Sequence, residues 1–316
     1  FIYKQNNMIQ LQKFNNLLEL LTYFKKEDTC KKYLEKIRWN GKLTCPYLEC
    51  QHDKVYKCKG RYKCANCERI YSVRVGTIFE DSKISLQKWF AAIYIVTSHK
   101  KGMSSTQLSK DLGVTQKTAW FMLQRIRTAF GLNQGKDKLT GTCEADETYI
   151  GGKEKNKHKN KRIFGTQGRS VKTKIPIVGI IERGGELRAE VVPNTTRKHL
   201  QIFINKHLEE GSRINTDEWK GYKGLSKTFD HKFVRHNTGE YVQGDVHTNT
   251  LEGFWSLLKR GLSGVYHTIS RKHLQRYVDE FVFRYNTRLA TEAERFDRFL
   301  RNISTQIKYK DLVLDC

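Results

Sequence analysis

The stretch "HTNTLEGFWSLLKRG", residues 247–261, is the most informative part of this chain for its fold. Its large apolar side chains recur at the three- and four-residue spacing of one helical face. That face carries Leu251, Phe254, Trp255, Leu258 and, just past the stretch, Leu262. A polar stripe on the opposite side carries Asn249, Glu252, Ser256 and Lys259. The pattern predicts a helix packed on a core through its apolar face, with a polar stripe that is either merely solvated or functional.

The composition favours a polyanionic partner. The chain has 316 residues, with 58 Lys and Arg against 33 Asp and Glu and a formal net charge of +25. This length suggests two or three domains, and this charge is typical of proteins that bind nucleic acid. A basic membrane-surface protein is the alternative, but the sequence has no long apolar run or signal-like segment. We therefore expect a soluble, cytoplasmic protein, associated with the nucleoid if it is bacterial. Because the sequence begins at Phe1 and not at a methionine, it does not define the true N-terminus.

Five of the eight cysteines lie within "CPYLECQHDKVYKCKGRYKCANC", residues 45–67. Two pairs flank a short, strand-rich stretch: Cys45 with Cys50, and Cys64 with Cys67. Four thiolates in a tetrahedral array are typical of structural Zn²⁺, and clustered cysteines in so basic a chain argue against a secreted disulfide framework. We predict a zinc ribbon over residues 41–78. Because the gap in the first pair is wide, Cys58 or His52 is an alternative for one ligand.

A helix-turn-helix DNA-binding domain is predicted over residues 79–135. Within "MSSTQLSKDLGVTQKTAWFMLQRIRTAF", residues 103–130, a turn at Gly113 separates two helical patterns, and Thr115 is the expected N-cap of the second. Its apolar face carries Ala119, Met122, Leu123 and Ile126. The side chains expected to be exposed for DNA contact are Gln116, Lys117 and Gln124. Such helix pairs also occur in other proteins, but the ribbon and the charge favour DNA.

From Gly141 onward the pattern changes to strands alternating with helices. We expect a strand in "TCEADETYIGG", a basic loop over 153–174, and a hairpin turning at Gly184-Gly185. A helix capped at Thr195 or Thr196, a short strand ending at Asp217, and two further helices follow. The expected organisation is a helical segment (1–40), the ribbon (41–78), the helix-turn-helix (79–135), an α/β RNase H-like domain with a mixed sheet flanked by helices (140–290), and a tail (291–316).

Three acids suggest the chemistry of that α/β domain. Asp146 lies within its first strand, Asp217 ends a later strand, and Glu252 lies on the helix of residues 247–261. Two strand-borne aspartates and a helix-borne acid are what an RNase H-like core uses to hold two divalent cations for phosphoryl transfer. Oxygen ligands suit Mg²⁺, or Mn²⁺ in its place.

Other acids compete for these roles because the chain has many of them. The rivals nearest in sequence are Glu144, Glu147, Glu218 and Asp245. Strand alternation puts Asp146 and Glu144 on one face of the sheet, and Cys143, Ala145 and Glu147 on the other. An acid at the centre of a strand is unusual unless it is paired or binds a metal, which favours Asp146.

Several motifs together resemble a known family. They are "CEADETYIGGK", "NTDEWKGY", "HTNTLEGFWSLLKRGLSGVYH" and "KHLQRYVDEFVFRYN", in that order, after a Cys-rich ribbon and "GTIFEDSKISLQKWF". In this order they resemble a bacterial insertion-sequence transposase of the DDE superfamily, from the group with an N-terminal zinc ribbon that is related to the eukaryotic Merlin elements. The resemblance covers about residues 35–288, nearly the whole chain.

The resemblance implies an RNase H-like catalytic domain that cuts element ends and joins the free 3′-hydroxyl to target DNA. Asp146 and Asp217 match the family's first two aspartates. Its third position is Asn, His or Glu with a downstream Lys, so Asn249 and Glu252 both match, and Lys259 matches the lysine. We expect Glu252 to be the third ligand because a carboxylate binds Mg²⁺ better than a neutral amide.

The remaining expectations concern phosphates and partners. Asn249 supplies a carbonyl ligand or positions a phosphate, while Lys259 and the adjacent Arg260 bind DNA phosphate. The expected partners are double-stranded DNA, as terminal inverted repeats and target, and a second copy of the chain in the DNA complex. One alternative is a zinc-ribbon and helix-turn-helix transcription regulator, although it has no use for the three acids. Another is a structure-specific DNA nuclease, although it hardly needs two sequence-reading modules.

Overall fold

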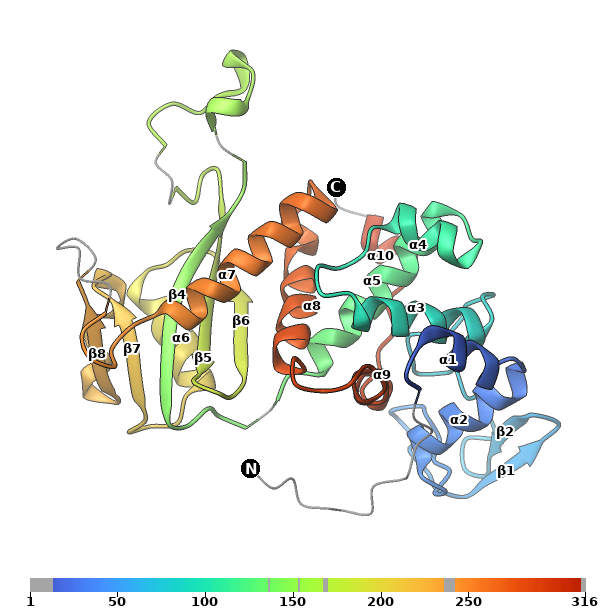
Figure 1. Ribbon diagram of the computed structural model, residues 1–316. Helices are drawn as coiled ribbons and strands as arrows, with labels where there is room; N and C mark the ends of the chain where they lie inside the picture. The colour runs from blue at the N-terminus through green and yellow to red at the C-terminus, as the bar shows by residue number, and fades with distance from the viewer. Residues whose placement is uncertain (1–13, 136, 153, 167–169, 236–241, 314–316) are drawn as a thin grey trace. The chain divides into compact units, whose positions relative to one another are not determined.

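The computed structural model describes residues 14–135, 137–152, 154–166, 170–235 and 242–313 (Figure 1). The chain divides into two compact units, one of residues 1–133 with 289–316 and one of residues 134–288. The start of the predicted N-terminal helical segment and the last three residues lie outside the described ranges. Within those ranges, no helix is both long and apolar enough to span a membrane.

The first unit contains a small three-stranded antiparallel sheet. Its strands, in the order β1-β2-β3, are β1 (Val55–Cys58), β2 (Arg61–Cys64) and β3 (Ile70–Tyr71). The ring of Tyr62 on β2 stacks on Tyr71 at 5.6 Å and meets Trp39 edge-on at 5.0 Å. Three aromatic rings are a small core for a module of this size, so further stabilisation has to come from the cysteine cluster described below.

Helices make up the rest of the first unit. They are α1 (Leu17–Tyr23), α2 (Glu27–Trp39), α3 (Leu86–Ser98), α4 (Ser105–Leu112), α5 (Gln116–Leu132), α9 (Glu292–Arg301) and α10 (Tyr309–Val313). Ten of the 13 residues of α3 are buried, so this helix is the centre of the unit.

The end of the chain belongs to this helical core. On α9, the ring of Phe296 packs edge-on against Phe90 of α3 at 5.7 Å. The Tyr33 hydroxyl of α2 donates to Asp297 Oδ1 at 2.5 Å. Residues after 289, which the sequence suggested only as a tail, therefore supply core side chains to a unit that begins near the N-terminus.

Helices α4 and α5 are joined by a tight turn. Gly113 adopts a left-handed conformation (φ +59°) that ends α4, and the Thr115 side chain accepts from the Thr118 N–H at the start of α5. The predicted apolar face of α5 is buried. The predicted exposure of Gln124 is wrong, because the helix is surrounded at this level and Arg125 and Arg127 beside it are buried as well.

The second unit is built on a five-stranded mixed sheet in the order β6-β5-β4-β7-β8 (Figure 1). The strands are β4 (Thr142–Ile150), β5 (Ile175–Glu182), β6 (Leu187–Val191), β7 (Arg213–Asp217) and β8 (Asp230–Val234). Strands β4, β5 and β6 pair antiparallel, whereas β7 and β8 run parallel to β4. The predicted mixed sheet flanked by helices is confirmed, and the mostly exposed edge strand β8 is an addition to it.

Helices cover both faces of this sheet. One face carries α6 (Arg197–His207) with the short 3₁₀ turns η3 (Lys220–Tyr222) and η4 (Leu225–Lys227). The other carries α7 (Asn249–Gly261), a π-helical turn η6 (Leu262–Tyr266), the 3₁₀ turn η7 (Arg271–His273) and α8 (Leu274–Asn286). Two further turns, η1 (Glu154–Asn156) and η2 (Lys159–Lys161), lie between β4 and β5.

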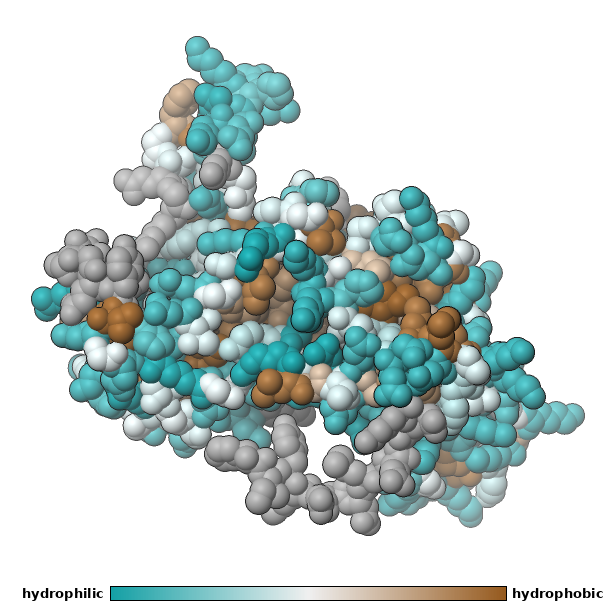
Figure 2. Space-filling model, in the orientation of Figure 1, coloured by the Kyte–Doolittle hydropathy of each residue, from teal (hydrophilic) through white to brown (hydrophobic). Residues whose placement is uncertain are grey.

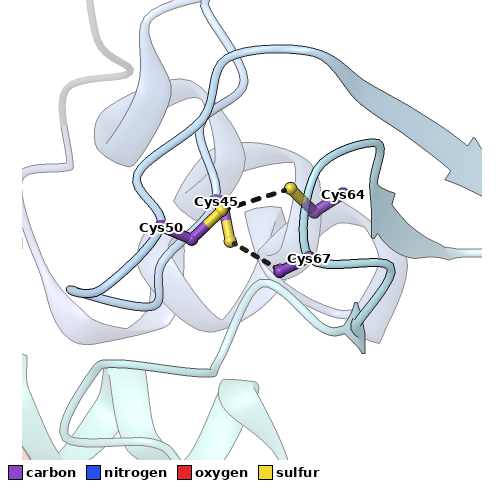
Figure 3. A group of neighbouring side chains, drawn as sticks. All are labelled: Cys45, Cys50, Cys64 and Cys67. Atoms are coloured by element: carbon purple, nitrogen blue, oxygen red, sulfur yellow. Dashed lines mark hydrogen bonds between the residues drawn. The ribbon is translucent and has the colours of Figure 1, made fainter.

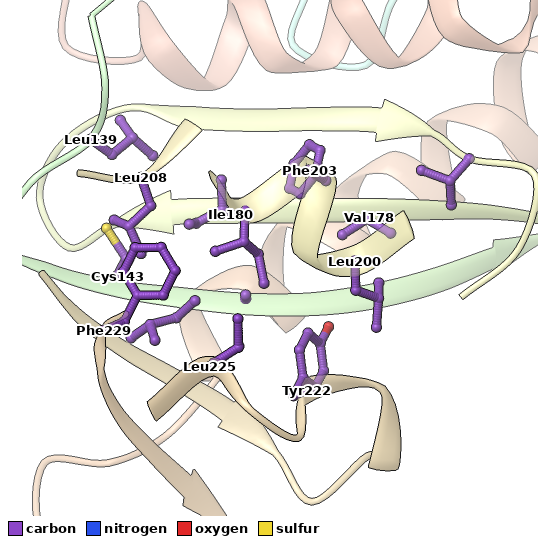
Figure 4. Close-up of a cluster of buried hydrophobic side chains, with 14 residues drawn as sticks. Leu139, Cys143, Val178, Ile180, Leu200, Phe203, Leu208, Tyr222, Leu225 and Phe229 are labelled. Carbon is purple, nitrogen blue, oxygen red and sulfur yellow. The ribbon is translucent and has the colours of Figure 1, made fainter. Parts of the chain in front are cut away.

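Each face of the sheet has its own apolar core. Cys143 and Ala145 of β4 lie in the core beneath α6, shown in Figure 4. Leu251, Trp255 and their apolar neighbours on α7 are buried in the other core with α8. The helical face predicted for residues 247–262 is therefore the packed one, and β4 alternates as predicted, with Glu144 and Asp146 toward α7.

Candidate active site and zinc site

Four cysteines of the ribbon converge on one point (Figure 3). The sulfur atoms of Cys45, Cys50, Cys64 and Cys67 all lie within 4.8 Å of one another. Cys45 Sγ is 3.7 Å from Cys67 Sγ, and Cys50 Sγ is 3.7 Å from Cys64 Sγ. Four ligands about 2.3 Å from a tetrahedral Zn²⁺ ion have sulfur atoms about 3.8 Å apart, so the cluster fits structural Zn²⁺.

The two alternative ligands lie elsewhere. Cys58 is exposed on β1, outside the cluster, and the His52 ring accepts from the Lys54 N–H through Nδ1 at 3.1 Å. Asn66 Nδ2 donates to Cys50 Sγ at 3.4 Å, the kind of outer contact that holds a metal-binding thiolate in place.

Two of the predicted acids lie on neighbouring strands, Asp146 at the middle of β4 and Asp217 at the end of β7. Asp146 is partly accessible on the α7 side, and Trp255 Nε1 donates to its Oδ2 at 3.1 Å. Asp217 is two residues beyond Asn215, which pairs with Glu144, so the two aspartates lie level on neighbouring strands. Its Oδ1 accepts from the Trp219 N–H at 3.0 Å.

Electrostatics link these acids to one another. Burial, together with the negative charges of Glu147, Asp217 and Glu252, raises the pKa of Asp146 to about 8. Among the described residues only the four cysteines bring three or more ligand atoms within 4.8 Å, so the carboxylates stand further apart. Asp146 of β4 nevertheless lies close enough to Asp217 of β7 and Glu252 of α7 for their negative charges to act on it.

The polar stripe of α7 is exposed along its whole length. Asn249, Glu252 and Lys259 all face solvent, and the Thr248 hydroxyl donates to Glu252 Oε1 at 3.3 Å. Arg260 is also exposed, and its Nε donates to the Ser256 carbonyl at 3.2 Å.

Two regions of the chain match known families. Residues 25–69 match the model of a transposase zinc-ribbon domain, and residues 138–286 match that of an ISXO2-like transposase domain. A protein of the transposable element ISH50 from Halobacterium salinarum, itself described as uncharacterized, is 32% identical over 265 residues. That alignment covers 79% of this chain and 88% of the relative. The chain belongs to the ISXO2-like transposase family. No solved structure matches it.

The transposase domain contains an acid that the sequence analysis treated only as a rival. Glu144 of β4 is completely buried and accepts hydrogen bonds from the N–H groups of Thr250 (2.9 Å) and Leu251 (3.2 Å) in the first turn of α7. The Thr250 hydroxyl donates to it as well, at 2.9 Å. A carboxylate at a helix N-terminus satisfies free N–H groups and interacts favourably with the helix dipole. Glu144 thus holds α7 at a fixed level on β4.

Arg183 neutralises this buried acid in the transposase. Its Nε donates to Glu144 at 2.8 Å, and its two terminal nitrogens donate to the carbonyls of Asp245 (2.7 Å) and His247 (3.2 Å). The segment that leads into α7 is thereby fastened to the β5–β6 hairpin. No signal in a single sequence identifies Arg183 for this role, because the contact joins residues more than 60 positions apart.

Two further rivals also have structural partners in the transposase domain. Glu147 points to the α6 side, where the buried Tyr222 hydroxyl donates to it at 2.9 Å. Asp245 forms an ion pair with Arg213 at 2.7 Å. The remaining rival, Glu218, follows Asp217 directly in sequence.

Two of the three residues predicted to read DNA lie at the start of α5, in the transposase's first unit. Gln116 and Lys117 are exposed, as predicted. Gln116 Nε2 donates to Ser105 Oγ of α4 at 2.7 Å, and the Lys117 ammonium lies 4.8 Å from the centre of the Tyr309 ring. Both side chains are therefore held in defined positions on the surface of the α4–α5 pair.

Proposed function

We propose that this chain is an active DNA transposase that binds element ends, cuts them and joins the free 3′-hydroxyl to target DNA. The observation that supports this most strongly is that Asp146 and Asp217 lie level on neighbouring strands, with Trp255 of α7 against Asp146, within a transposase domain. We further propose Mg²⁺ or Mn²⁺ as the metal, held by these three acids. Glu252 is the preferred third ligand because it is charged, and Asn249 begins the same helix as the alternative.

The protein's own groups orient the reactants. Asp146, Asp217 and Glu252 would hold a pair of divalent cations, which would supply activation of the attacking oxygen and stabilisation of the leaving oxygen of the phosphodiester. Asp146 and Asp217 offer oxygens from rigid neighbouring strands, and Trp255 fixes the direction of the Asp146 carboxylate. Lys259 and Arg260, exposed on α7, hold the phosphates of the cut strand.

Recognition of element ends is assigned to the first unit. The α4–α5 pair, within the proposed domain 79–135, has the short turn and exposed second-helix start of a helix-turn-helix. Gln116 and Lys117 are the proposed contacts in the DNA groove. The other proposed segments are the N-terminal helical segment (1–40), the zinc ribbon (41–78), the RNase H-like domain (140–290) and the tail (291–316). We also propose at least a dimer in the DNA complex, and kinship with bacterial and Merlin-type elements.

A joining assay tests this function. The purified chain is incubated with a labelled duplex that carries the inverted repeat flanking its gene, plus supercoiled plasmid, with Mg²⁺ or with EDTA. We expect metal-dependent 3′-end cleavage and joined product, both lost in Asp146→Asn and retained in Asp230→Asn, a matched change at an exposed acid of β8. End binding without cleavage under any divalent metal would instead indicate a regulator, and cleavage without joining a nuclease.

A further inference from the structure

The connection between β4 and β5 forms an arm, comprising the described residues 154–166 and 170–174. Strands β4 and β5 pair as far as Ile150 and Ile175, and the arm begins beyond that point. It carries η1 and η2 and stands away from the sheet in Figure 1. A connection this long with its own turns requires an explanation, because antiparallel neighbours are usually joined by two to five residues.

The tip of the arm is folded by its own contacts. Glu154 accepts from the Lys157 ammonium at 2.5 Å and from the Ile163 N–H at 3.0 Å. Arg162 donates through Nε to the Lys157 carbonyl and through Nη2 to the Lys155 carbonyl, both at 2.8 Å. The tip therefore has a defined shape without a partner, which lowers the ordering cost of binding one.

The arm carries a high density of positive charge. Residues 154–166 contain five Lys and Arg and one acid. Lys157 and Arg162 are used inside the tip, whereas Lys155, Lys159 and Lys161 are exposed. No acid within the described ranges forms an ion pair with these three lysines. Figure 2 shows the arm as a mostly hydrophilic projection.

Two apolar side chains interrupt this charge. Phe164 is 79% exposed and the adjacent Ile163 is 46% exposed. A single exposed apolar residue is common on any protein. An exposed aromatic ring beside several free lysines is a different combination, because it offers a face for a nucleobase together with cations for phosphates.

We propose that the arm binds the duplex DNA that flanks the cleaved phosphate, with Lys155, Lys159 and Lys161 on the backbone and Phe164 wedged against a base step. This rests on the proposed function. Ile150 is four residues beyond Asp146 on the same strand, so the arm begins about 13 Å from that aspartate at about 3.3 Å per residue. At about 3.4 Å per base pair, the arm meets DNA about four base pairs or more from the scissile phosphate.

The lysines are tested by a matched pair of triple variants. K155Q/K159Q/K161Q is compared with K198Q/K223Q/K227Q, which removes the same charge from exposed positions on the α6 side. Binding of a fluorescein-labelled duplex is measured by anisotropy across a salt series. The arm variant is expected to lose roughly 10- to 100-fold in affinity, with a salt slope shallower by up to about 2.7, because each lost phosphate contact removes about 0.9. Equal affinity and slope in the two variants would overturn the proposal.

The wedge is tested with a duplex that contains 2-aminopurine, whose fluorescence rises on unstacking. The full-length chain is expected to raise the signal, Phe164→Ala to lose the rise, and Phe164→Trp to restore it. Leu289→Ala, at a side chain that is 90% exposed, is the control and leaves the rise intact. An unchanged rise in Phe164→Ala contradicts the wedge.

Failure of this proposal is distinguishable from failure of the proposed function. Metal-dependent cleavage by all arm variants at wild-type rates and DNA concentrations leaves the transposase intact and removes the role of the arm. If the wild type does not cleave DNA but the arm variant still loses DNA affinity, the role of the arm stands and the proposed function is wrong. If sedimentation shows altered self-association while DNA affinity is unchanged, the arm contacts protein and the DNA proposal is wrong.

Discussion

Trp255 donates a hydrogen bond to Asp146 over 3.1 Å, and Gly179 on the neighbouring strand leaves the space through which the indole passes. Gly179 pairs directly with Asp146, and a Cβ added there would lie 2.8 Å from the ring carbons of Trp255. The ring thus belongs both to the apolar core beneath α7 and to the environment of the candidate metal ligand. A substitution of Trp255 therefore changes both the packing of the core and the surroundings of Asp146.

Gly179→Ala is expected to displace this indole and to lower strand cleavage by roughly 10-fold or more, because small shifts of a positioned group have large effects on rate. Trp255→Phe removes the donor together with part of the buried ring. Without that hydrogen bond the charged form of Asp146 is less favoured, so the variant should need a higher pH or more Mg²⁺ for half-maximal cleavage. The rate of cleavage is measured against pH and Mg²⁺, and wild-type profiles in both variants contradict the positioning role.

Glu144→Ala is expected to destabilise the second unit by about 3–5 kcal/mol, because it leaves Arg183 without its buried partner and exposes free N–H groups at the start of α7. Glu144→Gln keeps an acceptor and should lose less. Urea unfolding followed by tryptophan fluorescence measures both. Asp230→Ala, at the exposed edge strand, should change stability by no more than about 0.5 kcal/mol. Equal stability of Glu144→Ala and wild type would show that α7 is held by other contacts.

The third ligand is tested by comparing Glu252→Ala with Asn249→Ala. If Glu252 binds metal, its loss should abolish cleavage and leave DNA binding intact, while Asn249→Ala keeps measurable activity. The reverse ranking assigns the ligand role to Asn249. Lys259→Ala should weaken substrate binding, so additional Mg²⁺ should not restore its activity.

One equivalent of zinc per chain is expected, and Cys64→Ser should remove it together with the fold of the ribbon. Cys58→Ser is the matched control, because Cys58 is exposed and outside the cluster. Metal content is read by emission spectrometry and folding by proteolysis of residues 41–78. Zinc loss in Cys58→Ser, with retention in Cys50→Ser, would assign the site differently.

Asp279 on α8 makes the second unit less stable as the pH rises. Burial raises the pKa of its carboxyl to about 7, although Gln275 and Gln134 donate to it at 2.8 and 2.7 Å. Since the folded state holds this proton more tightly than the unfolded chain, stability is lost progressively between about pH 4 and pH 7. Asp279→Asn should therefore gain stability over wild type by more at pH 8.5 than at pH 5.5. A gap that is the same at both values contradicts this.

The sequence predicted those parts of the structure that depend on local spacing. The two faces of residues 247–262 follow from helical periodicity, the alternation of Glu144 and Asp146 follows from the strand repeat, and the ribbon follows from its cysteine pairs. The mixed sheet was also predictable, because strands and helices alternate after Gly141. Within that sheet the edge strand β8 was missed, since its mostly exposed, polar sequence carries no burial pattern.

The sequence did not predict what depends on distant partners. Gln124 was predicted to be exposed because a helix with one apolar stripe normally has a solvent-exposed opposite face. In the structure, however, α5 is buried on all sides around Gln124. Glu144 looked like a rival metal ligand because nothing local shows that Arg183 and the start of α7 occupy its oxygens. Both cases turn on tertiary contacts between residues far apart in the chain.

The return of α9 to the first unit has a consequence for synthesis on the ribosome. Tyr94 of α3 donates to Glu292 of α9, a partner 198 positions later. At a translation rate of about 5–20 residues per second, α9 is synthesised about 10–40 s after α3. The ring of Phe296 is missing from its contact with Phe90 for that whole interval. The first unit thus reaches its mature state only after the second unit has been made, and a chain that ends before residue 292 lacks part of the first unit's core.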